Sequence, residues 1–98
     1  MKKTITINGK PYVIKYTIRA LFIWEKITSK SFKIETLLDS YILMYAMLLA
    51  NNEDVLSWDD FLNAVDDNPN LLNEMDDVII DKNANLFPNE ESDSKKKV

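Results

Sequence analysis

The sequence predicts an α+β domain in which an N-terminal β-hairpin packs on a small bundle of about four helices, followed by a disordered C-terminal tail. Three observations support this fold. An Asn8-Gly9 pair separates two stretches of alternating apolar residues, apolar residues then recur at helical spacing to about residue 81, and the remaining residues are polar and lack periodicity. We assign residues 1–82 to a single domain and residues 83–98 to a flexible polar tail.

The predicted hairpin covers residues 3–16. Asn-Gly is the strongest short-range signal for a type I′ turn, because that turn needs positive φ at both central residues. Pairing outward from the turn places Thr6 opposite Pro11 and collects apolar side chains on one face, namely Ile5, Ile7, Tyr12, Ile14 and Tyr16. The pair containing Pro11 is not hydrogen-bonded, so the missing amide costs the hairpin nothing and discourages another strand from pairing along that edge.

The first two predicted helices cover about residues 18–29 and 35–50. Thr17 is placed to cap the first of them, and its broad apolar surface predicts that this helix covers the hairpin. The second contains an apolar run from Tyr41 to Ala50. A helix that is apolar all round is either buried on several sides or leaves an apolar face exposed, and a short chain has few elements with which to wrap it. We therefore expect an exposed apolar strip on the second helix.

Two shorter helices are predicted at residues 58–67 and 69–81. Ser57 is positioned as the N-cap of the first, whose apolar residues Trp58, Phe61, Leu62 and Val65 form an amphipathic stripe. Asn68-Pro69 then ends this helix and starts the next, with proline at the first helical position. Both tryptophans are expected in the core, and Trp24 is expected to keep one edge exposed.

Partner binding is predicted for the expected apolar strip, for Trp24 and for two apolar residues of the tail. The residues concerned are Trp24, Tyr41, Met44, Tyr45, Leu48, Leu86 and Phe87. A partner would meet side chains on helices, because Pro11 protects the hairpin edge.

Composition argues against an enzyme. The chain has neither cysteine nor histidine, which removes thiolate chemistry and the commonest general base and metal ligand, and its single glycine cannot build a glycine-rich phosphate loop. The acidic pairs Asp59-Asp60 and Asp66-Asp67 lack the alternating ligands and turn glycine of a calcium loop, so we interpret them as solvated helix faces. We predict no catalytic residue, no metal site and no cofactor.

The N-terminus and the longest apolar run predict a soluble intracellular protein without membrane contact. No apolar region follows Lys2 and Lys3, as a signal peptide would require. The run from Tyr41 to Ala50 is ten residues long, whereas a membrane span needs about 20.

Charge is distributed unevenly along the chain. Residues 1–33 carry seven lysines and Arg19 against Glu25 alone, whereas residues 34–94 carry fifteen acidic residues against Lys82. The asymmetry marks either an interaction surface or two parts that neutralise each other in the fold. A single arginine argues against nucleic-acid binding. For Arg19 we expect a structural salt bridge, with docking of a partner as the alternative.

The order of these elements resembles the tail assembly chaperones of long-tailed bacteriophages, which are small acidic proteins encoded just before the tape-measure protein. The likeness rests on "ITINGKPYVIKYTIRALFIWEKITSKSF", a hairpin leading into a helix with R-A-L-x-x-x-E-K. It continues in "LSWDDFLNAVDDNPNLL", an acidic helix followed by one that begins at proline. Together these segments cover roughly residues 4–80.

The resemblance implies a non-enzymatic protein that binds the hydrophobic tape-measure protein and keeps it soluble while tail tube subunits assemble around it. It also implies a location in the cytoplasm of the bacterial host and absence from the mature virion. Some family members are also made as a longer form by a −1 frameshift, whose extension recruits the tail tube protein. The lysines at 95–97 lie where such a slip would occur. Self-association of the chain stays open.

Two other functions stay open on the sequence. One is a small acidic regulatory or inhibitory protein of a phage or prophage, which would block a host protein by imitating nucleic acid with its acidic helices. The other is a minor structural protein of the virion, such as a head–tail connector.

Overall fold

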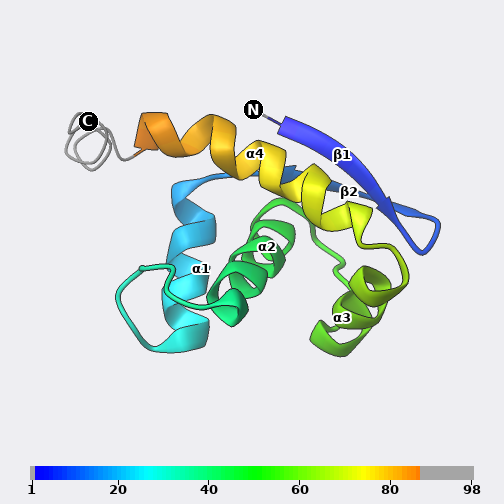
Figure 1. The fold of residues 1–98 in the computed structure, drawn as a ribbon, viewed down its shortest axis with the longest axis horizontal. Helices are drawn as coiled ribbons and strands as arrows, with labels where there is room; N and C mark the ends of the chain where they lie inside the picture. Colours follow the sequence, from blue (N-terminus) through cyan, green and yellow to red (C-terminus); the bar gives the residue numbers. More distant parts are fainter. Residues whose placement is uncertain (1, 87–98) are drawn as a thin grey trace.

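The computed structural model describes residues 2–86, and of residues 80–86 it describes the backbone alone. It confirms the predicted α+β fold, a hairpin followed by four helices (Figure 1). The elements are β1 (Lys2–Ile7), β2 (Lys10–Lys15), α1 (Ile18–Thr28), α2 (Leu37–Asn51), α3 (Trp58–Asp67) and α4 (Asn70–Leu86). Residues 87–98 of the predicted tail lie outside the described residues.

The hairpin has the predicted turn and register. Asn8 and Gly9 both have positive φ, at 53° and 82°, as a type I′ turn requires. Thr6 pairs with Pro11 as predicted. The predicted apolar face is confirmed, since all five of its side chains are buried: Ile5, Ile7, Tyr12, Ile14 and Tyr16.

The end of α2 covers part of the outer edge of β2. The Val13 amide donates to Asn52 Oδ1 at 2.9 Å, and Asn52 Nδ2 donates to the Val13 carbonyl at 2.8 Å. Asn51 Nδ2 donates to the Lys15 carbonyl at 3.0 Å. The side chains of Asn51 and Asn52 therefore form hydrogen bonds with backbone groups of β2 that another strand could otherwise pair with. Pro11, on the same edge, has no backbone N–H to donate.

The helices that cover the hairpin are α2 and α4, which corrects the expectation for α1. Helix α2 contacts β2, helix α4 contacts both strands, and α1 packs on α2 (Figure 1). Leu71, Met75 and Val78 form the buried stripe of α4, and an ion pair of 3.5 Å joins Lys3 to Asp77. Helix α1 has a broad apolar surface, but it packs on α2 and buries only part of that surface, namely Ala20, Leu21 and Trp24.

Helix ends follow local capping. Thr17 caps α1 and Ser57 caps α3 as predicted, since their hydroxyls accept from the amides of Ala20 and Asp60, each at 3.1 Å. Helix α2 begins at Leu37 rather than at 35, because Thr36 is its N-cap. Helix α4 extends to Leu86, past the predicted end at 81, and the segment 82–86 contains neither proline nor glycine to stop it.

We expect Asn52→Ala to lower the free energy of unfolding by about 1–2 kcal/mol, because both hydrogen bonds to Val13 are lost. The measurement is urea denaturation followed by circular dichroism. Asn63→Ala is the matched control, since Asn63 is exposed on α3 and should change stability by less than about 0.5 kcal/mol. Equal stability of the two variants would show that the Asn52 bonds contribute nothing.

Candidate protein-binding groove

Apolar side chains are exposed on α1 and at the beginning of α2. Leu37 and Leu38 are 74% and 58% exposed, and they follow Ile34, which is also exposed. On α1 the exposed apolar residues are Ile18, Phe22 and Ile27. Exposed leucines at the start of an otherwise well-buried helix mark this end of the molecule as a surface for contact with another molecule.

An apolar groove of about 500 Å³ lies along α2. Its floor is one stripe of α2 at spacing i, i+4, i+7 and i+11, formed by Leu38, Ile42, Tyr45 and Leu49. Ile27 of α1 forms one wall and Trp58 of α3 the other. A second hollow of about 360 Å³ adjoins the groove and shares Leu38 and Trp58 with it, extending the apolar surface to Leu37, Tyr41 and Leu62.

Asp39 fixes α1 against α2 and so positions the first wall. Its carboxylate accepts from the amides of Glu35 (2.9 Å) and Thr36 (3.1 Å), while the Thr36 hydroxyl accepts from the Asp39 amide, which completes a capping box. Trp24 Nε1 donates to the Asp39 carbonyl at 2.9 Å. Lys30 forms an ion pair with the same carboxylate at 3.4 Å.

The pKa of Asp39 lies below its ordinary value. The largest cause is the hydrogen bond from the Glu35 amide, and the Thr36 amide and Lys30 act in the same direction, whereas burial opposes them. The carboxylate is therefore ionised at neutral pH, which the ion pair with Lys30 requires.

Tyr45 fixes α3 against α2 and so positions the second wall. Its hydroxyl donates to the Leu56 carbonyl at 2.7 Å, in the loop that leads into α3. Its ring lies 5.4 Å from the ring of Trp58 and 5.5 Å from that of Phe61, within the range of favourable aromatic contacts. Burial raises the pKa of Tyr45, so at neutral pH the phenol keeps the proton that it donates.

Of the residues predicted to bind a partner, Tyr41 and Tyr45 lie at the groove and are partly exposed. Trp24, Met44 and Leu48 do not: each is buried in the core, so the fold leaves them no surface for a partner. The expectation of an exposed edge on Trp24 is wrong, and it is Trp58 that is partly exposed. Leu86 is the last residue of α4, and its side chain and Phe87 lie outside the described residues.

Most groove residues were not among the residues predicted to bind a partner. The groove is lined by Ile27, Ile42, Leu49 and Trp58, which were not predicted. The exposed Leu37 and Leu38 precede the apolar run from Tyr41 to Ala50 on which the prediction was based. The signal that could have found the floor is the spacing of Leu38, Ile42, Tyr45 and Leu49 on a single helix face.

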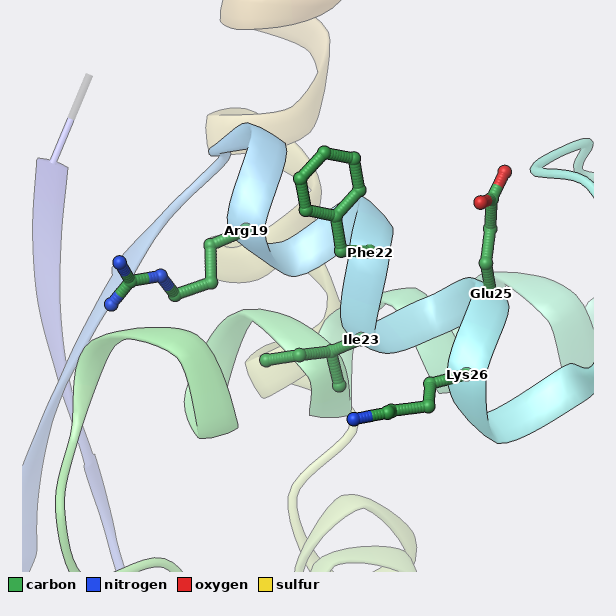
Figure 2. Close-up of a pocket in the computed structure, with 5 residues that line it drawn as sticks. All are labelled: Arg19, Phe22, Ile23, Glu25 and Lys26. Carbon is green, nitrogen blue, oxygen red and sulfur yellow. The ribbon is translucent and has the colours of Figure 1, made fainter.

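Basic residues accompany a shallower hollow of about 350 Å³ on α1. Arg19, Ile23 and Lys26 point to one side of α1, and Phe22 and Glu25 point to another (Figure 2). None of the ion pairs between described residues includes Arg19, so the salt bridge expected for it is not found among them. Arg19 is exposed on α1.

Among the side chains that the structure describes, those of residues 2–79, no cluster of acidic groups is arranged to hold a metal ion. None of the described helices combines the length and apolar character needed to cross a membrane. The side chains that line the groove offer apolar contact.

Comparisons with known proteins give no match: no family model, no curated protein and no solved structure is similar to the chain.

The two tryptophans should differ sharply in solvent access. We expect Trp58→Phe to remove most of the fluorescence that acrylamide quenches, because the remaining Trp24 has no exposed surface. Stern–Volmer plots of the wild type and the variant give the comparison. Equally strong quenching of the variant would show that Trp24 is accessible and would contradict the placement of the core.

Stability should depend on the charge of Asp39. Because folding lowers the pKa of Asp39, its contribution is present at pH values above the ordinary carboxyl pKa and is lost as pH falls through the folded-state pKa. We therefore expect Asp39→Asn to melt at a lower temperature than the wild type at pH 7, with a smaller difference below about pH 4. Asp76→Asn, which changes an exposed acid of α4, serves as the control. A constant difference across this pH range would contradict the assignment.

Proposed function

We propose that this chain is a non-enzymatic binding protein whose groove holds an apolar helical segment of another protein. The observation that carries the proposal is the apolar floor along α2, open between Ile27 and Trp58. Tyr45 is the one floor residue with a polar side-chain atom, and its hydroxyl is used by the Leu56 carbonyl. Such a surface gains free energy by removing apolar side chains from water rather than by positioning a reacting group.

A helix is the ligand that this shape favours. The floor residues Leu38 to Leu49 span about 16 Å of helix axis, which is roughly three turns. Their spacing repeats every three to four residues, so the apolar face of an amphipathic helix can interdigitate with it. An extended strand would leave its backbone groups unpaired against this apolar surface.

The resemblance to tail assembly chaperones supplies the identity of the proposed client, the tape-measure protein of a long-tailed bacteriophage. A long, largely helical and hydrophobic client needs its apolar faces covered until the tail tube forms around it. The groove offers such cover, and the net charge of −4 helps to keep a loaded complex in solution. In this role the protein works in the cytoplasm of the bacterial host and is left out of the mature virion, and a longer form would also bind the tail tube protein.

Co-expression with the neighbouring tape-measure protein tests the proposal. We expect the wild type to yield a soluble complex, and Leu38→Asp to weaken the complex roughly ten- to hundredfold, because one apolar contact of about 1.5–3 kcal/mol is replaced by a charge. Leu38 is exposed, so this substitution should leave the fold intact, which circular dichroism can verify.

Phe22→Asp is the matched control, because Phe22 is equally apolar, is 65% exposed and lies outside the groove. Its complex should be as abundant as that of the wild type. A client that stays insoluble with the wild type, or one bound equally by Leu38→Asp, would contradict the proposal. Detection of the chain in purified particles by mass spectrometry would favour a structural virion protein instead.

A further inference from the structure

The two walls of the groove carry opposite charge. On the α1 side, Arg19 and Lys26 are exposed and point, with Ile23, to the side of α1 on which α2 lies (Figure 2). Ile23 and Ile27 are four residues apart and share a helix face, so these cations flank the wall that Ile27 forms. A ligand in the groove would meet positive charge along this side.

On the α3 side the charge is negative. Trp58 and Leu62 face the groove and its adjoining hollow, and they are four residues apart on one face of α3. Asp59 lies three residues before Leu62 and Asp66 four residues after it, so both adjoin Leu62 on the helix surface. Both aspartates are exposed.

Among the described residues, these charges take part in no ion pair. The ion pairs between described residues join Lys3 to Asp77, Lys10 to Asp54, Lys30 to Asp39 and Lys33 to Glu35. None includes the cations of α1 or the aspartates beside Leu62. The charged rims therefore remain available to complement the flanks of a helix between them.

We infer that the groove binds an amphipathic helix with one acidic and one basic flank, and that the opposite charges of its walls fix the direction in which this helix lies. The inference rests on the function proposed above and adds the chemical character of the ligand. The acidic flank of the ligand lies along α1 and its basic flank along α3.

The handedness of the α-helix determines which ligand takes which direction. When a ligand helix runs parallel to α2, the residue that follows each of its apolar contact residues points toward α3, and the residue that precedes it points toward α1. A parallel ligand is therefore favoured by lysine after, and glutamate before, each contact residue. Exchanging the two charges favours the antiparallel direction, because reversal of the helix exchanges its flanks.

Two peptides of identical composition test the direction. Both peptides begin with Cys-Gly and carry leucines at the spacing of the groove floor. In the first peptide, each leucine is preceded by glutamate and followed by lysine. In the second peptide, each leucine is preceded by lysine and followed by glutamate. The chain has no cysteine, so Glu35→Cys and Glu53→Cys place a unique thiol before or after α2. Both positions are exposed. Disulfide yields in a glutathione buffer then report which end of the groove each peptide's N-terminus reaches.

We expect the first peptide to couple preferentially to Glu35→Cys and the second to Glu53→Cys, each by roughly fivefold, from a few exposed ion pairs. The preference should shrink in 1 M salt, which screens exposed charges. Introducing Arg19→Glu and Asp66→Lys together into each cysteine variant should abolish the preference. Both substitutions place the new charge at a helix end where the helix dipole favours it, so the fold should be retained.

The outcomes separate the inference from the proposed function. If the peptides bind in calorimetry but couple equally to both thiols, the inference is wrong and the proposed function stands. If the preference survives Arg19→Glu with Asp66→Lys, the walls do not set the direction and the inference is again wrong. If neither peptide binds, or if a second copy of the chain fills the groove as a stable dimer, both fail.

Discussion

Asp39 joins α1 to α2 through both its backbone and its side chain. The buried indole of Trp24 donates to its carbonyl, while its carboxylate closes the capping box of α2 and meets Lys30. Loss of this contact would free the end of α1 from the start of α2, and Ile27, near that end, is one wall of the groove. The apolar surface thus depends on one ionised residue that is itself almost fully buried.

The groove also follows from the size of the domain. Helix α2 has more apolar surface than its neighbours can cover: the hairpin meets one side of it, α1 a second and the start of α3 a third. Helix α4 packs on the strands and leaves the groove floor of α2 uncovered. Among the described residues, no further helix lies over this stripe. An open stripe is the expected result of placing a nearly all-apolar helix at the centre of so few elements.

Local features of the sequence predicted local structure well. The Asn8-Gly9 turn determined the register and therefore the buried face of the hairpin, and Thr17 and Ser57 marked the beginnings of two helices. The groove was harder to predict because periodicity cannot tell which side of an apolar helix its neighbours cover. Met44 and Leu48 are as apolar as Ile42 and Leu49, and only the positions of α1, α3 and the hairpin decide that the first two are buried. For the same reason, Trp24 is buried although an exposed edge was expected, and Trp58 is partly exposed although it was expected in the core.

The hydroxyl of Tyr45 has a consequence for the range of ligands. Since it is committed to the Leu56 carbonyl, and since no buried side-chain polar atom of the described residues lacks a partner, the floor offers a ligand no hydrogen bond to satisfy. Such a floor distinguishes ligands by the spacing of their apolar side chains. It tolerates exchanges among leucine, isoleucine and methionine at those positions of the ligand. In the proposed role, many segments of one long client protein can then serve as equivalent ligands, so several copies of this short protein could coat one client.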